Sequence, residues 1–448
     1  MYYWIDFKFN CRFVKRNKKI YQYALIWPPE LIILVKQFKI KALHIEKFKS
    51  LLLELFFKYF FQTLPRNYEF EILKTKRRTE IFSSAKLFFQ LPEGTTKYFK
   101  NLNKLLQNIS RSIFSTSVSC QITYGACCIQ DCLARYNGYS QIFHYGHSCL
   151  VSISNCIVWI IYIFIEIKYD FSFLLESIKE IFSPHKDKIS LTCTIQFSSE
   201  IKLIKTFISQ VFTVLDAPQN KPLSPSEILG CTSFRTENNS GVIYIGDGKF
   251  HVESVLLFNP NIKILQFNPF KRSLVLLGFK FTETLSERKN FIEKSLFLTR
   301  EVNFIFGTLG RQGSIKILKT MESLAFQKKF RKNVYLASEI ENIRLNSLSR
   351  NSRSVWIQLS CPRLSLDWGF YFKNIILTPF EFSILTKTTK VYANFLPMDF
   401  YSKIGKFWSS YSILSLKFKL EYFHENFLTV KKYNYFKNFI SLHLNESV

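Results

Sequence analysis

The sequence predicts an α/β protein with three similar parallel-sheet domains arranged around a shared central site. Short apolar runs alternate with segments of helical periodicity, a pattern typical of parallel strands linked by helices. The pattern occurs three times along the 448 residues, a length that exceeds one ordinary core. Each round contains one isolated cysteine in a turn that follows a predicted strand. Because ligands of parallel sheets bind beyond the carboxyl ends of the strands, we expect these turns to converge.

The recurring pattern divides the chain into five regions. A basic and aromatic extension is expected over residues 1–64, with a proline-led helix start near its middle. Three α/β domains are expected over 65–170, 171–280 and 281–402. A basic stretch over 403–448 is interpreted as a peripheral helix or a poorly ordered tail.

The first round is predicted to contain four strands and one long helix. The strands are expected at Leu87–Leu91, before the turn Tyr124–Cys128, at Gln141–Phe143 and at Ile157–Ile165, and the helix at Lys97–Ile109. The run from Cys156 to Ile165 is rich in β-branched and aromatic residues, which favours a central strand covered on both faces. It is about half as long as a membrane-spanning helix must be, so no transmembrane segment is predicted.

The second and third rounds repeat this layout. Strands of the second round are expected at Leu191–Phe197, Val242–Ile245 and Ile262–Phe267, and a helix is expected to have an apolar face of Ile201, Ile204, Ile208 and Val211. Strands of the third round are expected at Val302–Phe306, Val334–Ala337 and Val355–Leu359, and a helix is expected to have an apolar face of Ile317, Met321 and Leu324.

Three of the ten cysteines lie in predicted turns with distinctive neighbouring residues. Cys127 occurs in Tyr-Gly-Ala-Cys-Cys, Cys231 in Gly-Cys-Thr-Ser and Cys361 in Ser-Cys-Pro-Arg. No Cys-x-x-Cys pair occurs, which argues against ribbon-type zinc sites and thioredoxin-type redox sites. We hypothesise that the three thiolates hold one iron-sulfur cluster, and that the iron without a cysteine is open to a substrate.

The alternative is that each cysteine is a small buried apolar residue. This interpretation is preferred for Cys11, Cys120, Cys156 and Cys193, and spacing alone also favours it for Cys231 and Cys361. Cys128, Cys132 and Cys149 lie close to the predicted site in the sequence. Adjacent side chains are not expected to point at one cluster together, so Cys127 is preferred over Cys128.

The glycine-rich run from Gly307 to Ser314 precedes a predicted helix. It lacks the Gly-Lys-Ser/Thr of a phosphate loop. Its glycines would still let the backbone approach a ligand, its amides would favour an anionic group, and Arg311 could bind a carboxylate. A tight strand-to-helix turn with an exposed arginine is an equally good interpretation.

Other polar residues near these turns have less specific patterns. The histidines at 144, 147 and 251 lack the spacing of a zinc protease and are interpreted as polar neighbours of the site. Asp247 and Glu253 could form an acid/base pair, but carboxylates beside a glycine turn more often cap or solvate it. Asp367 and Trp368 are interpreted as local scaffolding.

The formal net charge of +28 would attract nucleic acid, acidic membranes or an acidic partner. The basic residues are spread along the chain together with abundant Phe, Tyr, Ile and Asn, as an AT-rich genome would produce, so nucleic acid is not expected as a direct ligand. The amino terminus lacks the features of a secretory signal, which favours a cytoplasmic setting with reduced thiols.

Taken in order, the motifs of this chain resemble those of the diphthamide synthase family, in particular its subunit 1 branch, the 2-(3-amino-3-carboxypropyl)histidine synthases. The matching segments are Tyr-Gly-Ala-Cys-Cys, His-Tyr-Gly-His-Ser-Cys-Leu, Lys-Pro-Leu-Ser-Pro-Ser-Glu-Ile-Leu-Gly-Cys-Thr-Ser, Gly-Asp-Gly-Lys-Phe-His, Gly-Thr-Leu-Gly-Arg-Gln-Gly-Ser and Cys-Pro-Arg-Leu-Ser-Leu-Asp-Trp-Gly. The similarity runs from about Pro28 to Tyr401. Gln130 and Ile315 depart from the pattern, replacing a commonly acidic residue and a frequent proline.

The resemblance implies a 4Fe-4S cluster with one cysteine from each of three domains, at positions matching Cys127, Cys231 and Cys361. It implies that S-adenosylmethionine binds at the open iron and that its 3-amino-3-carboxypropyl group is transferred, by a radical mechanism, to a histidine of elongation factor 2. This is the first step of diphthamide biosynthesis, and it requires no acid/base dyad. The residues expected to contact the substrate or cofactor are Tyr124, Gly125, Asp247, His251, Gly310, Arg311 and Gln312.

The resemblance also implies partners: diphthamide synthase subunit 2 in a heterodimer, and a CSL-type metal protein as electron donor. Two other functions are compatible with the sequence. The chain could be a non-catalytic or electron-relaying subunit of the same complex, or a basic RNA- or ribosome-binding protein on a decayed enzyme fold. The presence of all three cysteines favours the enzyme.

Overall fold

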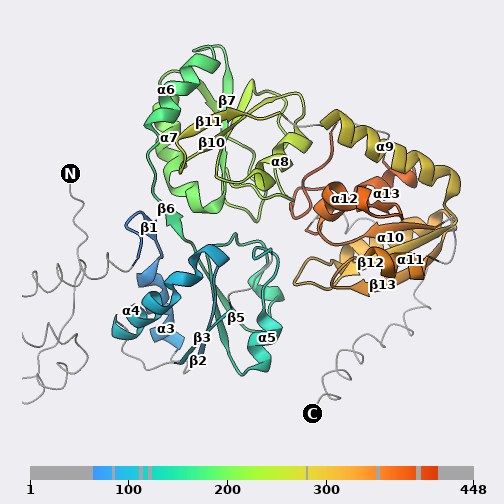
Figure 1. Ribbon diagram of the computed structural model, residues 1–448, viewed down its shortest axis with the longest axis horizontal. Coiled ribbons are helices and arrows are strands. Elements are labelled where there is room, and N and C mark those ends of the chain that lie inside the picture. Colours follow the sequence, from blue (N-terminus) through green and yellow to red (C-terminus); the bar gives the residue numbers. More distant parts are fainter. Residues whose placement is uncertain are drawn as a thin grey trace, which may run out of the picture.

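The computed structural model describes residues 64–82, 86–109, 115–119, 124–278, 281–349, 354–389 and 395–411. The predicted extension before residue 64, most of the predicted tail, Cys11 and Cys120 lie outside these ranges. Within them the chain forms three larger sheets with flanking helices and one two-stranded sheet (Figure 1), so the prediction of an α/β fold with mostly parallel sheets is confirmed. None of the helices in these ranges is long and apolar enough to cross a membrane.

The first sheet is entirely parallel, with strand order β3-β2-β4-β5. Its strands are β2 (Lys86–Gln90), β3 (Ser115–Ser119), β4 (Gln141–Tyr145) and β5 (Trp159–Ile163), and its helices are α3 (Ile72–Phe82), α4 (Phe99–Ile109) and α5 (Asp131–Tyr136). A 3₁₀ helix, η4 (Glu93–Tyr98), leads into α4, so the helical segment begins before the predicted start at Lys97. The two-stranded pair β1 (Tyr68–Glu69) and β6 (Glu166–Ile167) closes this domain toward the next.

The prediction of a central strand over the apolar run ending at Ile165 was wrong. β5 pairs only with β4 and forms an edge, and its Trp159 is 62% exposed. The interior positions belong to β2 and β4, and all five residues of β4 are buried, including Gln141 and His144. These polar residues interrupt the apolar pattern of β4, so apolar content alone pointed to the wrong strand.

The second sheet has the order β11-β10-β9-β7-β8, with only β11 antiparallel. Its elements are β7 (Lys188–Cys193), β8 (Thr213–Leu215), β9 (Gly241–Ile245), β10 (Lys263–Asn268), β11 (Ser273–Leu276), α6 (Ser172–Ile181), α7 (Ile201–Ile208) and α8 (Lys249–Phe258). Three of the residues predicted to form the apolar face of α7 are buried: Ile201, Ile204 and Ile208. The predicted strand to Phe197 ends earlier, because the 3₁₀ helix η6 begins at Ile195.

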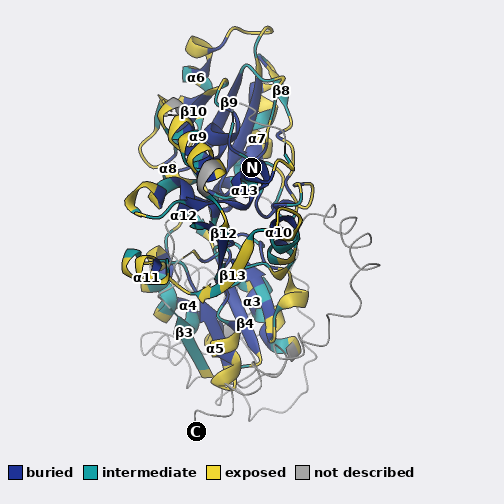
Figure 2. Ribbon diagram, turned by 90° about the vertical axis from the view of Figure 1, so that its right-hand side faces the viewer, coloured by how far each residue is buried: buried dark blue, intermediate teal, exposed yellow. Residues whose placement is uncertain are grey.

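The third sheet is parallel, with the order β13-β12-β14-β15. Its elements are β12 (Glu301–Gly307), β13 (Arg331–Ala337), β14 (Ser354–Gln358), β15 (Ile376–Leu377), α9 (Phe281–Leu298), α10 (Ile315–Gln327), α11 (Asn342–Leu348), α12 (Pro362–Trp368), η7 (Gly369–Tyr371) and α13 (Pro379–Leu385). All three residues predicted for the apolar face of α10 are buried. Figure 2 shows the strands of the sheets mainly buried and the edge strand β13 largely exposed.

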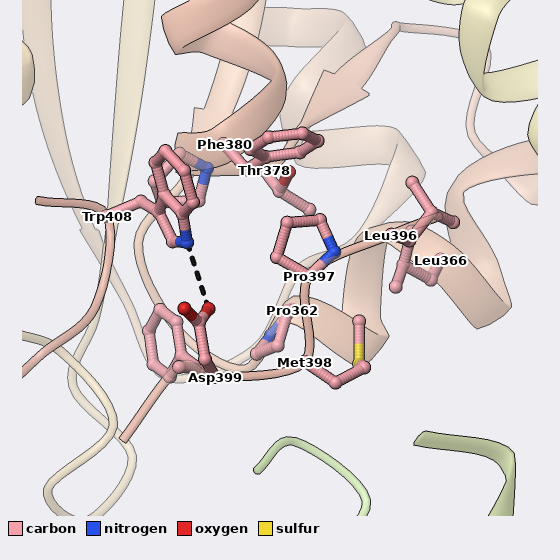
Figure 3. A pocket seen from close by; sticks show the side chains of 11 residues that line it. Pro362, Leu366, Thr378, Phe380, Leu396, Pro397, Met398, Asp399 and Trp408 are labelled. Atoms are coloured by element: carbon pink, nitrogen blue, oxygen red, sulfur yellow. Dashed lines mark hydrogen bonds between the residues drawn. The ribbon is translucent and has the colours of Figure 1, made fainter. Parts of the chain in front are cut away.

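The chain returns from the third domain to the other two through residues 395–411, which we call the return segment. Its backbone bonds to the second domain from Met398 O, Phe400 N and Lys403 N, and the Tyr411 hydroxyl donates to Leu150 O of the first domain at 2.9 Å. Trp408 is 6% exposed and its indole donates to Asp399 at 2.9 Å (Figure 3). Residues 403–411 are therefore packed against the core, where we predicted a peripheral tail.

Candidate functional site

The first cysteine turn is fixed by its own backbone and by a histidine. Tyr124 adopts a φ of 58°, and its carbonyl accepts hydrogen bonds from the backbone N–H groups of Cys127 and Cys128 at 3.0 and 3.1 Å. A Cβ on Gly125 would lie 2.0 Å from Nε2 of His147, so a larger residue there would displace the imidazole. The predicted role of His147 as a polar neighbour of this turn agrees with that contact.

The glycine-rich loop after β12 packs directly on this turn. Gly310 has a φ of 58°, and a Cβ there would lie 2.6 Å from Cα of Cys128. The backbone N–H of Arg311 donates to Cys127 O at 2.8 Å. Nε2 of the buried Gln312 lies 3.6 Å from the Cys127 sulfur and 3.9 Å from the Cys128 sulfur. Both adjacent thiols therefore lie beside one amide, although we expected them to point apart.

The guanidinium of Arg311 forms an ion pair with the buried carboxylate of Asp131, at the start of α5. The other Asp131 contacts are backbone N–H groups, from Cys132 at 3.1 Å and Ile157 at 3.0 Å. The charge that we expected Arg311 to offer a substrate carboxylate is thus compensated by Asp131 in this structure. The ion pair also ties the third domain to the first.

The second cysteine turn packs against the start of α8. The backbone N–H of Gly230 donates to Nδ1 of His251 at 3.1 Å, so this nitrogen carries no proton. Burial lowers the pKa of His251 to about 4, and the charge of Asp247 opposes that effect. Asp247 itself is exposed, ahead of α8. His251 thus supports the turn of Cys231, while Asp247 is placed toward solvent.

Cys361 is the N-cap of α12, whose first position is a proline. Two residues later, Arg363 reaches across to the second domain. It donates to Phe250 O at 2.9 Å, to Glu253 at 2.5 Å and to Asp367 at 2.8 Å, and more weakly to Gly230 O at 3.5 Å. Glu253 is therefore paired with Arg363, and the acid/base pair that we considered for it and Asp247 does not form.

A cleft of about 460 Å³ opens beside this arginine, between the second and third domains. Its lining residues are Phe250, Glu253, Leu257, Thr284, Arg363, Leu366, Asp367 and Phe370. The volume lies within the range of roughly 300–1,000 Å³ that is usual for small-molecule sites. The cleft combines apolar walls with three converging charged side chains, and it lies next to the turns of Cys231 and Cys361.

The three predicted cysteines influence one another electrostatically. Burial, and then the charge of Cys127, raises the pKa of Cys231 to about 12. Burial and the charges of Cys231 and Cys127 raise the pKa of Cys361 well above its usual value. The pKa of Cys127 is raised most by its neighbour Cys128 and next by burial. Contacts also link the turns, because Arg363 donates to Gly230 O beside Cys231, and Cys231 packs against the apolar cluster that contains Cys127.

In the described part of the chain, no three Cys, His, Asp or Glu side chains lie close enough to share a single metal ion. An iron-sulfur cluster has a different requirement, because each thiolate binds its own iron atom and the ligands stand several ångströms apart. The three thiols come from separate turns, and Cys127 is buried whereas Cys231 and Cys361 are partly buried. The remaining described cysteines form no disulfide and range from the buried Cys193 to the exposed Cys132.

Tyr401 of the return segment belongs to the same region, and our sequence analysis gave it no role. It is 2% exposed, and its hydroxyl has no hydrogen-bond partner. Burial, followed by the charges of Cys127, Cys231 and Cys361, raises its pKa well above the usual value. Tyr401 therefore lies within electrostatic range of all three thiols. Its inclusion in Pro-Met-Asp-Phe-Tyr was the only signal in the sequence.

Comparison with known proteins places this arrangement in a family. The family model described as diphthamide synthesis protein matches residues 91–395, which include all three cysteine turns. The chain belongs to the diphthamide synthesis protein family. Within this family it is 37% identical over 358 residues to 2-(3-amino-3-carboxypropyl)histidine synthase subunit 1 of Dictyostelium discoideum, covering 78% of this chain and 74% of that protein. The resemblance inferred from the motifs is thus confirmed.

Other members of the diphthamide synthesis family support the same placement. The mouse subunit 1 is 37% identical over 344 residues, covering 76% of this chain and 77% of its own. The crystal structure of Dph2 from Pyrococcus horikoshii shares the fold, with a TM-score of 0.60 and 21% identity over 73% of this chain and 94% of that chain. A second structure of that protein is described as containing a 4Fe-4S cluster. The curated relatives are synthases by name, in agreement with the predicted enzyme.

Acidification is expected to destabilise this family member through His147. Burial lowers the pKa of His147 to about 4, whereas an unfolded histidine titrates near about 6.5. The unfolded chain therefore binds the proton first, and the free energy of unfolding falls as the pH drops below about 6.5. The urea midpoint of His147→Gln should fall less between pH 7 and 5 than that of the wild type.

The exposed His185 offers a matched control for this measurement. The midpoint of His185→Gln should follow the wild type across the same pH range. Parallel pH dependences for wild type and His147→Gln would contradict the assignment to His147.

Proposed function

We propose that this chain is the cluster-binding subunit of an enzyme of diphthamide biosynthesis. It would transfer the 3-amino-3-carboxypropyl group of S-adenosylmethionine to a histidine of elongation factor 2. The observation that carries this proposal is the proximity of three cysteine turns, one from each domain, in a chain of the diphthamide synthesis family. The names of the curated relatives support the group that is transferred.

In this proposal Cys127, Cys231 and Cys361 hold a 4Fe-4S cluster. When bound and reduced, the cluster supplies one electron for the cleavage of S-adenosylmethionine and leaves one iron for the substrate. The chain's own residues would limit the access of water to this centre, because the return segment and Arg363 contact the turn of Cys231 and Gly310 packs on the turn of Cys127. Such shielding protects reactive species from solvent.

The side chains around the cysteines would position the substrate. Gly310 lets the backbone approach closely, and Gln312 places an amide beside the Cys127 sulfur. Arg311 would contribute through its backbone and, if the Asp131 ion pair opens, through its charge. The cleft beside Arg363 has room for a small molecule. Tyr124 is 48% exposed and would line the entrance. Its pKa is raised first by burial and then by the charges of Cys361 and Asp367, which lie near it.

The proposal also includes partners and location. The chain would act in the cytoplasm with the related second subunit, and a CSL-type metal protein would supply electrons. The acceptor is a protein, so a binding surface for elongation factor 2 would surround the entrance to the site.

Anaerobic reconstitution with iron and sulfide tests this function. The full chain, with its partner subunit, should take up a 4Fe-4S cluster and form methylthioadenosine from S-adenosylmethionine under reduction. Elongation factor 2 in the same reaction should gain the mass of one aminocarboxypropyl group. A cluster that forms and is reduced without any methylthioadenosine would instead indicate an electron-relaying subunit. A chain that binds RNA and no iron would contradict the enzyme altogether.

A further inference from the structure

The Tyr401 hydroxyl is a buried polar group that the protein leaves without a partner. The residue is 2% exposed, and its Oη forms no hydrogen bond within the described part of the chain. Leaving such a group unpaired lowers the stability of the fold, because its hydrogen bonds to water are lost without replacement. The ring centres of Tyr401 and the neighbouring Tyr411 lie 5.8 Å apart. Unlike Tyr401, Tyr411 has a hydrogen-bond partner, because its hydroxyl donates to Leu150 O at 2.9 Å.

The backbone around Tyr401 is held firmly against the second cysteine turn. The N–H of Tyr401 donates to Oγ1 of Thr232 at 3.2 Å, and the N–H of Phe400 donates to Cys231 O at 3.2 Å. The ring packs in the same apolar cluster as Cys127, with Cys231 against it. The position of the hydroxyl is therefore set by the same contacts that set the turn of Cys231.

A sulfur acceptor would satisfy this hydroxyl. Tyrosine keeps its proton up to a pH of about 10, so Oη is a donor at neutral pH. Thiolate and sulfide sulfurs of an iron-sulfur cluster accept hydrogen bonds, and these bonds are among the factors that set the reduction potential. A donor stabilises the reduced cluster more than the oxidised one, because the reduced cluster carries more negative charge.

We propose that the Tyr401 hydroxyl donates a hydrogen bond to a sulfur of the cluster and thereby raises its reduction potential. Tyr401 is then a positioning and tuning residue for the proposed reaction, supplied by the return segment and not by any of the three cysteine turns. The inference rests on the proposed function, because it requires the cluster.

Tyr401→Phe and Tyr411→Phe form a matched pair for the test. Each full-length protein is reconstituted anaerobically, and its reduction potential is measured by titration with paramagnetic resonance detection. Tyr401→Phe should retain the iron content of the wild type and shift the potential to a more negative value. Tyr411→Phe loses a hydrogen bond to Leu150 and should leave the potential unchanged. If the two tyrosines had only structural roles, both variants would lose stability and neither would change the reduction potential of the cluster.

A second readout uses the Tyr124→Phe variant, in which the hydroxyl of Tyr124 cannot contribute a signal and the site of Tyr401 is that of the wild type. Tyrosine labelled with oxygen-17 at the hydroxyl should show magnetic coupling to the reduced cluster. The absence of coupling would overturn the inference even where Tyr401→Phe fails to fold. An unchanged potential in loaded Tyr401→Phe would overturn it as well. A wild-type chain that takes up no cluster would overturn the proposed function together with the inference.

Discussion

Cys231→Ala is expected to abolish the cluster and with it all aminocarboxypropyl transfer. Three thiolates hold the proposed cluster, so loss of one leaves two irons without a protein ligand. Cys231 lies in the turn that the return segment and His251 brace, and no described cysteine can take its place from that turn. Iron should fall from about four atoms per chain to less than one, with loss of the visible absorption of the cluster.

The other cysteines of the first domain provide the controls. Cys132→Ala removes an exposed thiol and should keep both iron and activity. Cys128→Ala tests the assignment within the adjacent pair, because both sulfurs lie near Gln312. It should retain the cluster, whereas Cys127→Ala should lose it. Full iron content in Cys231→Ala would refute the proposed ligand set.

Arg288→Ala is expected to cause the largest loss of stability. The guanidinium of Arg288 in α9 donates to both oxygens of Glu381 at 2.6 Å, and further to the carbonyls of Ser365 and Ile376. The two charged side chains are 2% and 0% exposed. Removing the cation leaves a buried carboxylate without its partner, which typically lowers the free energy of unfolding by about 3–5 kcal/mol. Urea unfolding of the full chain measures this as a lower midpoint.

An exposed ion pair of the second domain provides the comparison. Arg272 lies 3.4 Å from Asp170, and both side chains are about half exposed or more, at 67% and 49%. Exposed pairs contribute about 0–1 kcal/mol, so Arg272→Ala should scarcely change the midpoint. Similar decreases in the urea midpoints of Arg288→Ala and Arg272→Ala would contradict a stabilising effect of burial on the Arg288 ion pair.

Most of the longer strands could be predicted because they follow local apolar runs, whereas the short strands β8, β11 and β15 were not predicted. The faces of α7 and α10 were likewise predicted from residues at helical spacing. The edge position of β5 could not be, because it depends on which strand finally lies beside β4. The 3₁₀ helix after Cys193 was missed for a related reason: an apolar residue at Ile195 fits a strand and a turn equally well.

Candidate site residues could be proposed from the sequence where their motifs are local, and they were missed where the site depends on distant contacts. The turns around Cys127, Cys231 and Cys361 have distinctive neighbours in the sequence, and the structure brings them within electrostatic range of one another. Arg363 stood in a quoted motif, yet its link to Phe250 and Glu253 joins two domains. Tyr401 is equally remote in sequence from the thiols it approaches. Such pairings become visible only in three dimensions.

The return segment has a consequence for the order of events during biosynthesis. Its contacts with Cys231, Thr232 and Leu150 come from the last described residues of the chain. A nascent chain that ends before residue 361 lacks both Cys361 and the covering Tyr401. In the proposed function, the cluster site has both Cys361 and Tyr401 only after translation has passed residue 401, so iron would be inserted late in biosynthesis.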